Sequence, residues 1–114
     1  MNKQDWKEDA RKLHVALVQD KVVPWSEEDK RFLALAFCGE AGELANFVKK
    51  QWRDGHTAER EAEIGKELAD CRIYLELQAM AYGVDLDAAC TDKLQELHKR
   101  WPHLKSVNSS TYAR

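Results

Sequence analysis

The sequence predicts an all-α protein whose helices form a four-helix, bundle-like fold. Apolar residues recur every three or four positions through most of the chain, which is the period of a helix buried along one face. No segment alternates apolar and polar residues in the way that a half-buried strand does. Turn and capping residues interrupt the periodic segments at three places, so four helices are expected.

The first predicted helix covers residues 5–20 and ends at the proline-containing segment 22–25. Ser26 is a good N-cap for the second predicted helix, and Asp29 three residues later resembles a capping box. That second helix covers residues 26–53. The apolar stripe expected on the first helix consists of Trp6, Ala10, Leu13 and Leu17.

The turn sequence at residues 54–55 ends the second helix. The third predicted helix covers residues 57–82, with Thr57 as its N-cap. Asp85 is the N-cap of a fourth helix, which covers residues 85–101 and stops before a proline. These boundaries leave only short connections between the four helices.

Residues 1–105 are expected to form a single domain, followed by a flexible polar tail at residues 106–114. A net charge of −2 gives no basic field for a nucleic-acid partner, and the longest apolar run, residues 32–38, is far too short to cross a membrane. The N-terminus lacks the pattern of a signal peptide. Three cysteines without a CxxC spacing predict buried free thiols in a reducing compartment, so we expect a cytoplasmic protein.

The second and third predicted helices carry more apolar surface than one buried stripe requires. In each helix a line of apolar residues runs beside the line that contains acidic residues. Four helices cannot cover both lines, so we expect a homodimer or homotetramer built on these central helices. The adjacent apolar lines are Leu33, Phe37, Leu44 and Val48 in the second helix, and Ile64, Leu68, Cys71, Leu75 and Tyr82 in the third.

Two acidic pairs stand in these otherwise apolar helices. Glu40 and Glu43 are three residues apart, as are Glu67 and Asp70, so each pair shares one helical face. A helical hairpin would place the two pairs opposite each other. Carboxylates about 5 Å apart repel each other by about 3 kcal/mol at an effective dielectric of about 20. A divalent cation relieves such repulsion, as do protonation and pairing with Lys or Arg, and ligation by oxygen alone suits Mg²⁺, with Mn²⁺ as a substitute.

Two other interpretations of the acidic residues compete with a magnesium site. In the first interpretation, the acidic residues are ordinary solvated surface residues, since a chain with 20 acidic residues contains several such spacings by chance. The second is a di-iron carboxylate bundle, which needs Glu-x-x-His on two helices. The residues three positions before the four histidines are Arg11, Arg53, Gln95 and Arg100. The sequence therefore disfavours the di-iron interpretation.

The spacing of the acidic pairs resembles the signature of the MazG-like all-α nucleoside triphosphate pyrophosphohydrolases. Glu40-x-x-Glu43 on one predicted helix is followed by Glu67-x-x-Asp70 on the next, and the similarity covers residues 30–102. The resemblance implies a MazG-type fold in which these four acidic residues bind Mg²⁺ and form the catalytic site. It also implies that a metal-activated water cleaves the bond between the α- and β-phosphates of an NTP or dNTP.

The sequence departs from the family pattern at three positions. Gly39 stands where many members have a glutamate, which is similar to the dCTP-hydrolysing branch. Phe32 and Leu97 stand where relatives often carry asparagine. These last two departures concern contacts to base and sugar and leave the metal site intact.

Four further residues are candidates for contact with the substrate. Lys93 lies on the inward stripe of the fourth helix, where a contact with a phosphate is favoured over snorkelling of the side chain to solvent. For Arg100, the phosphate contact and the snorkelling both stay open. Glu63, one turn before Glu67, is a candidate fifth ligand or water-orienting base, or else an exposed residue at a helix start. Trp25 is a candidate to stack on a nucleobase, although a tryptophan in such a loop more often fills a core.

The sequence therefore predicts a Mg²⁺-dependent enzyme that releases pyrophosphate from nucleoside triphosphates, in nucleotide-pool house-cleaning or dNTP regulation. No nucleic-acid polymer or membrane is expected as a partner. One alternative is a phosphoribosyl-ATP pyrophosphohydrolase-like enzyme of the same architecture. The other is a non-catalytic helical interaction module that keeps the acidic cluster for structure.

Overall fold

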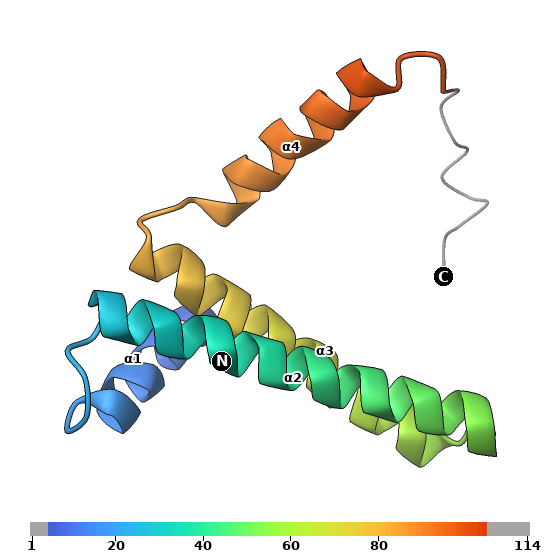
Figure 1. Ribbon diagram of the computed structural model, residues 1–114, viewed down its shortest axis with the longest axis horizontal. Helices are drawn as coiled ribbons and strands as arrows, with labels where there is room; N and C mark the ends of the chain where they lie inside the picture. The colour runs from blue at the N-terminus through green and yellow to red at the C-terminus, as the bar shows by residue number, and fades with distance from the viewer. Residues whose placement is uncertain (1–4, 105–114) are drawn as a thin grey trace. The chain divides into compact units, whose positions relative to one another are not determined.

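The computed structural model describes residues 5–104, and within that range it confirms the all-α class. Four helices and no strand are present there (Figure 1). Their ends lie within two residues of the predicted ends. The tail predicted at residues 106–114 lies outside the described residues. In chain order the helices are α1 (Asp5–Val18), α2 (Glu27–Asp54), α3 (Ala58–Ala81) and α4 (Leu86–Arg100).

Side chains cap the starts of α2, α3 and α4, where the first N–H groups have no partner within the helix. Ser26, Thr57 and Asp85 each accept a hydrogen bond from the N–H three residues later, at 3.1–3.2 Å. The capping box predicted at Ser26 is wrong. The Asp29 carboxylate does not return to the Ser26 N–H but accepts a hydrogen bond from the backbone N–H of Trp25 at 2.8 Å.

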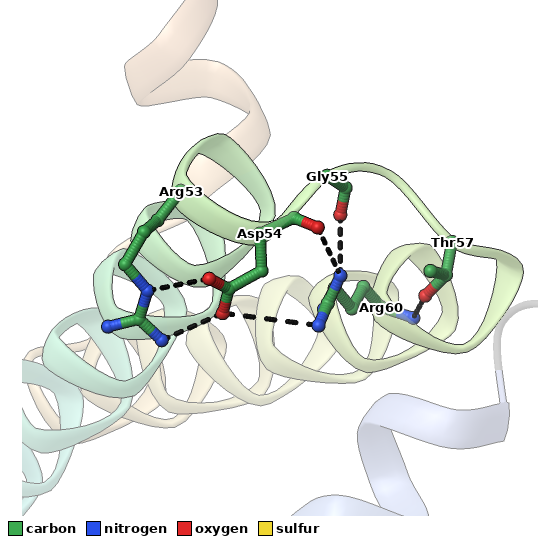
Figure 2. A network of polar contacts seen from close by, with 5 residues as sticks. All are labelled: Arg53, Asp54, Gly55, Thr57 and Arg60. Atoms are coloured by element: carbon green, nitrogen blue, oxygen red, sulfur yellow. Dashed lines mark hydrogen bonds and ion pairs between the residues drawn. The ribbon is translucent and has the colours of Figure 1, made fainter.

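A tight turn joins α2 and α3, which run side by side as a hairpin (Figure 1). Gly55 has a φ of 99° and a ψ of 163°, a conformation that essentially only glycine adopts. Arg60 Nη1 donates to the carbonyls of Gly55 at 2.7 Å and of Asp54 at 3.3 Å, as Figure 2 shows. Arg53 holds the Asp54 carboxylate at 2.8 Å. The first turn of α3 therefore satisfies carbonyl groups at the end of α2 that lack helical partners.

The core of α1, α2 and α3 is small. Polar contacts reinforce it on α1, where Lys7 Nζ lies 3.7 Å from Glu76 Oε1 and the Arg72 guanidinium lies 5.3 Å from the Trp6 ring centroid. The apolar stripe predicted for α1 is partly wrong, since Leu13 and Leu17 are 59% and 66% exposed. The buried apolar side chains are Val18 from α1, Leu33 from α2, and Leu77 and Ala79 from α3.

Several large apolar side chains on α2 and α3 are exposed, among them Leu35, Trp52 and Leu68. The predicted burial of the cysteines is wrong for Cys38, which lies one turn after Leu35 on the exposed side of α2. Cys90 lies on α4, and its predicted burial stays a prediction. The predicted homo-oligomer stays a prediction.

The chain divides into two compact units, one ending at Val84 and the other beginning at Asp85. Helices α1, α2 and α3 belong to the first unit and α4 to the second. A single domain over residues 1–105 therefore stays a prediction. Among the described residues, no helix has both the length and the apolar character needed to cross a membrane.

Candidate active site

The hairpin brings acidic residues of α2 and α3 together. Glu40 and Asp70 stand at equal distances in the sequence on either side of Gly55, so antiparallel helices place them opposite each other. Glu40, Glu67 and Asp70 each offer a carboxylate oxygen, and these oxygens lie within 4.8 Å of one another. We call these three residues the acidic cluster.

Glu43, the fourth predicted ligand, lies next to the acidic cluster and is exposed. Among the described residues, the group of oxygens within 4.8 Å does not include those of Glu43. Its negative charge nevertheless raises the pKa of both Glu40 and Glu67, and its side chain hydrogen-bonds with Glu67. The structure therefore assembles three of the four predicted ligands and leaves Glu43 beside them.

The surroundings raise the pKa values of both Glu40 and Glu67. The pKa of Glu40 rises to about 7, first through burial and then through a hydrogen bond with Glu67 and the charges of neighbouring acids. Burial also raises the pKa of Glu67, but its hydrogen bond with Glu40 lowers it. Two carboxyls that interact in this way titrate as a pair.

Two oxygens of the acidic cluster, Glu40 Oε2 and Glu67 Oε2, are buried and have no hydrogen-bond donor. Ionised carboxylates can only accept hydrogen bonds, so these two satisfy each other only by holding a proton between them. Buried acceptors left without a donor cost free energy. A divalent cation would satisfy both and remove the repulsion, and hard carboxylate oxygens fit Mg²⁺ or Mn²⁺.

The acidic cluster also affects two neighbouring side chains of α3. The pKa of the Tyr74 hydroxyl is raised, first by burial and then by the charges of Glu40 and Asp70. Burial and the charges of the acidic cluster likewise raise the pKa of the Cys71 thiol. Both groups stay protonated at neutral pH, so Tyr74 can donate a hydrogen bond and Cys71 is a poor nucleophile.

A cavity of about 350 Å³ opens beside the acidic cluster, with Glu40 and Asp70 in its wall. The rest of the wall comes from α1 and α3 and is mostly apolar. Ligand sites in proteins typically combine such an apolar wall with a few polar groups. The remaining lining residues are Trp6, Asp9, Ala10, Leu13, His14, Leu17, Ile73, Tyr74 and Leu77.

The other predicted site residues make local contacts. Glu63 is half-buried and accepts a hydrogen bond from Lys66 Nζ at 3.3 Å. Trp25 is half-buried in the loop before α2, where its ring centroid lies 5.5 Å from that of His14. Neither residue belongs to the acidic cluster or lines the cavity beside it. Their roles as water-orienting base and base-stacking residue stay predictions.

Lys93 and Arg100 lie on α4, in the second unit. Both bind the same carboxylate oxygen, Glu96 Oε1, at 3.2 Å from Lys93 Nζ and 3.3 Å from Arg100 Nη2. These are exposed ion pairs between neighbouring turns of one helix, which contribute little to stability. The predicted phosphate contacts of both cations stay predictions.

The sequence interpretation missed a buried pair, His14 and Asp29. The two residues are 5% and 0% exposed, and His14 Nε2 lies 2.9 Å from one Asp29 oxygen and 3.0 Å from the other. The two residues lie on different helices, far apart in the sequence, so no local spacing connects them. The one usable signal is that His14 shares a helical line with Val18, the residue of α1 that enters the core.

The family model of the MazG nucleotide pyrophosphohydrolase domain matches residues 29–105, and these residues are more than half of the chain. The chain belongs to the MazG family. The matched part of this MazG domain contains both acidic pairs and therefore the whole acidic cluster. The resemblance inferred from the acidic spacing is confirmed.

The MazG domain is also similar to curated mammalian proteins named dCTP pyrophosphatase 1. The human (Homo sapiens) and rat (Rattus norvegicus) proteins are each 33% identical to it over 114 residues, and the bovine (Bos taurus) protein is 32% identical. Each of these matches covers 92% of this chain and 65% of the relative. The chain therefore spans slightly less than two thirds of the length of the relatives it matches.

Proposed function

We propose that this MazG-family protein is a Mg²⁺-dependent nucleotide pyrophosphohydrolase that cleaves a (d)NTP to (d)NMP and pyrophosphate. The acidic cluster carries the proposal, because it has two buried oxygens without a donor and borders a cavity. Family membership supports the reaction class. The name of the mammalian relatives, dCTP pyrophosphatase 1, supports a deoxynucleotide substrate.

The residues of the acidic cluster divide the work between metal binding and proton transfer. Mg²⁺ held there would supply positive charge for the phosphates and lower the pKa of a bound water. Glu40 is our candidate for accepting the proton of the attacking water, because its carboxylate lies in the acidic cluster and in the wall of the cavity beside it. Glu63, the other candidate base, already accepts a hydrogen bond from Lys66 one turn away.

The MazG resemblance implies attack at the α-phosphorus, with pyrophosphate as the leaving group. In-line attack requires the water to stand opposite that leaving group. We assign the departing phosphates to the cations of α4, Lys93 first and Arg100 second. We assign the base and sugar to the mostly apolar cavity next to Glu40 and Asp70.

The proposed setting is a cytoplasmic enzyme that clears or regulates nucleotides. The exposed apolar side chains of α2 and α3 support a homodimer or homotetramer, because contact with a second copy would remove their apolar surface from water. Leu35, Trp52 and Leu68, exposed by 73%, 85% and 54%, are the surface residues that we assign to the contact between copies.

A substrate panel with product analysis tests the proposed function. Canonical and modified NTPs and dNTPs, together with phosphoribosyl-ATP, are incubated with Mg²⁺ and followed by ³¹P NMR. We expect NMP and pyrophosphate in equal amounts, dCTP among the substrates, and no reaction after chelation of the metal. Turnover of phosphoribosyl-ATP alone would replace the proposal by that enzyme class. No turnover of any compound, together with a co-purified partner protein, would favour an interaction module.

Matched variants connect the reaction to the acidic cluster. Glu67→Gln should lower the rate by at least about 10²-fold, because it removes a charged oxygen from the proposed metal site. Glu59→Gln changes the same charge on the same helix, but Glu59 is exposed in the first turn of α3. The control should therefore keep the wild-type rate, and equal losses in both variants would contradict the assignment of the site.

A further inference from the structure

A cluster of charged and aromatic side chains joins the N-terminal half of α1 to α3. We call its members, Trp6, Lys7, Arg72 and Glu76, the α1 latch. Glu76 is buried, and its Oε1 lies 3.7 Å from Lys7 Nζ of α1 and 3.9 Å from Arg72 Nε of α3. The Arg72 guanidinium and the Lys7 ammonium also lie near the Trp6 ring, at 5.3 Å and 6.0 Å from its centroid. None of these four residues belongs to the acidic cluster.

The α1 latch contains ion pairs that salt can weaken. A buried carboxylate is costly without an opposite charge beside it, so Glu76 attracts Lys7 across the two helices. Both ion-pair distances are longer than a hydrogen bond, so the attraction depends on charge more than on a fixed geometry. The side chains of Lys7 and Arg72 are 33% and 63% exposed, and dissolved ions can therefore screen their charges.

The two halves of α1 are held in different ways. The C-terminal half is anchored by the buried Val18 and by the buried His14, which pairs with Asp29 of α2. From Trp6 to Leu13 no residue is buried. The α1 latch thus fastens a half-helix that gains little from apolar burial. Loss of the latch would release this half while the other half stays anchored.

The half of α1 that the latch fastens is part of the wall beside the acidic cluster. α1 lines the cavity of about 350 Å³ from Trp6 to Leu17, and Glu40 and Asp70 stand in the wall of the same cavity. Trp6 also borders a second cavity of about 470 Å³, together with residues of α3 that include Arg72. Movement of Trp6 away from α3 would therefore open the space next to the acidic cluster.

We propose that α1 is a lid over the cavity beside the acidic cluster and that the α1 latch keeps this lid closed. The lid pivots about its anchored C-terminal half. With the latch closed, α1 covers the bound nucleotide, and with the latch open the nucleotide and its products can pass. The inference rests on the proposed function for the identity of the ligand, whereas the movement of α1 itself requires no ligand.

The environment of Trp6 reports the position of the lid without any nucleotide. Labelling with 5-fluorotryptophan gives a ¹⁹F resonance for Trp6, which is assigned by its absence in Trp6→Phe. The shift of this resonance between H₂O and D₂O measures contact of the ring with solvent. In the wild type we expect that contact to increase between about 0.01 M and about 1 M NaCl, because the Debye length falls from about 30 Å to about 3 Å.

Lys7→Gln tests the latch, because it removes the cation on α1 and leaves Glu76 paired with Arg72. Lys12→Gln is the matched control, with the same change of charge at an exposed position of the same helix. We expect Lys7→Gln to expose Trp6 already at low salt and to lose most of the response to salt, whereas the control behaves as the wild type. Glu76→Gln should act as Lys7→Gln does, and Lys7→Gln keeps the proposal testable if that buried substitution does not fold.

The release of α,β-imido-dCTP connects the lid with the nucleotide. With Mg²⁺ present, stopped-flow displacement should show release about fivefold faster from Lys7→Gln than from the wild type, an effect of the size of one partly exposed ion pair. The control should release the analogue at the wild-type rate. The stabilisation by Mg²⁺ alone should not change, since the acidic cluster is untouched. Equal release rates from Lys7→Gln and the wild type would overturn the role of the lid in nucleotide passage.

The lid and the proposed function can fail separately. Turnover of nucleotides by a protein whose Trp6 resonance responds neither to salt nor to Lys7→Gln overturns the lid alone. A Trp6 resonance that responds to both, in a protein that binds the analogue but hydrolyses no nucleotide, overturns the proposed reaction alone. A protein that shows neither the response of Trp6 nor any turnover overturns both.

Discussion

At the scale of single residues, Glu40 has a pKa far above that of a glutamate in water. Burial, the hydrogen bond with Glu67 and the nearby negative charges raise its pKa to about 7. In an unfolded chain the pKa of a glutamate is about 4.3. The folded protein therefore binds this proton more tightly than the unfolded chain, and the associated stability is complete below the unfolded pKa and lost as pH rises through about 7.

The first prediction follows from this difference in pKa. Without divalent metal, the melting temperature of the wild type should fall between pH 5 and pH 8, and in Glu40→Gln the fall should be smaller because the amide does not titrate. Mg²⁺ should restore the stability of the wild type at pH 8, since the cation replaces the lost proton. Thermal melts at several pH values measure both effects. Superimposable pH profiles for wild type and variant would contradict the raised pKa of Glu40.

A second prediction ranks the carboxylates by their place in the structure. Glu67→Gln should remove most of the increase in melting temperature that Mg²⁺ produces through binding to the native state. Glu43→Gln should remove a smaller part, because Glu43 is exposed and acts on the acidic cluster through its charge. Differential scanning fluorimetry with increasing Mg²⁺ gives the order. A larger loss in Glu43→Gln would mean that the metal binds outside the acidic cluster.

At the scale of elements, the turn between α2 and α3 sets the register that joins the acidic residues. Gly55→Ala should destabilise the fold by about 1–3 kcal/mol, because alanine is strained at the backbone angles of Gly55. Gly65→Ala is the control, with open space around the added methyl group in the interior of α3, and should stabilise by up to about 1 kcal/mol. Chemical denaturation measures both changes. A neutral Gly55→Ala would show that the turn tolerates another conformation.

The sequence predicted the elements well where the signal was local. Caps such as Ser26 and Thr57, and the glycine after α2, depend on a few adjacent residues, and the helix ends agree within two positions. The acidic cluster could be predicted for the same reason, since residues three positions apart lie on the same face of a helix. Asp29 was misassigned to a capping box because its partner His14 lies on another helix. Long-range pairing of this kind leaves no periodic trace in one sequence.

At the scale of the whole molecule, the exposed apolar side chains lead to the prediction of assembly. Light scattering at micromolar concentration should give a mass of two or four times that of a single chain. Leu35→Lys should lower that mass, because a charge would be buried in the contact between copies. Glu59→Gln again serves as the control. A wild-type monomer would contradict the homo-oligomer proposed on α2 and α3.

The association of copies of the chain was the property that was hardest to predict from the sequence. Apolar periodicity shows that a helix face avoids water, but it does not distinguish burial in the same chain from burial against a second copy. The exposed Cys38 illustrates this point, since its apolar surroundings in the sequence suggested a buried thiol. The acidic cluster was easier to predict, because spacings of three residues place acidic side chains on one face of each of two adjacent helices.

Hydrolysis of dCTP in ¹⁸O-labelled water, with Mg²⁺ and analysis of products by mass spectrometry, tests the proposed chemistry of the acidic cluster most directly. A water activated there and directed at the α-phosphorus places the label in dCMP and leaves the released pyrophosphate unlabelled, with no accumulation of dCDP. The label in pyrophosphate or in free orthophosphate, or dCDP that appears before dCMP, would contradict attack at the α-phosphorus.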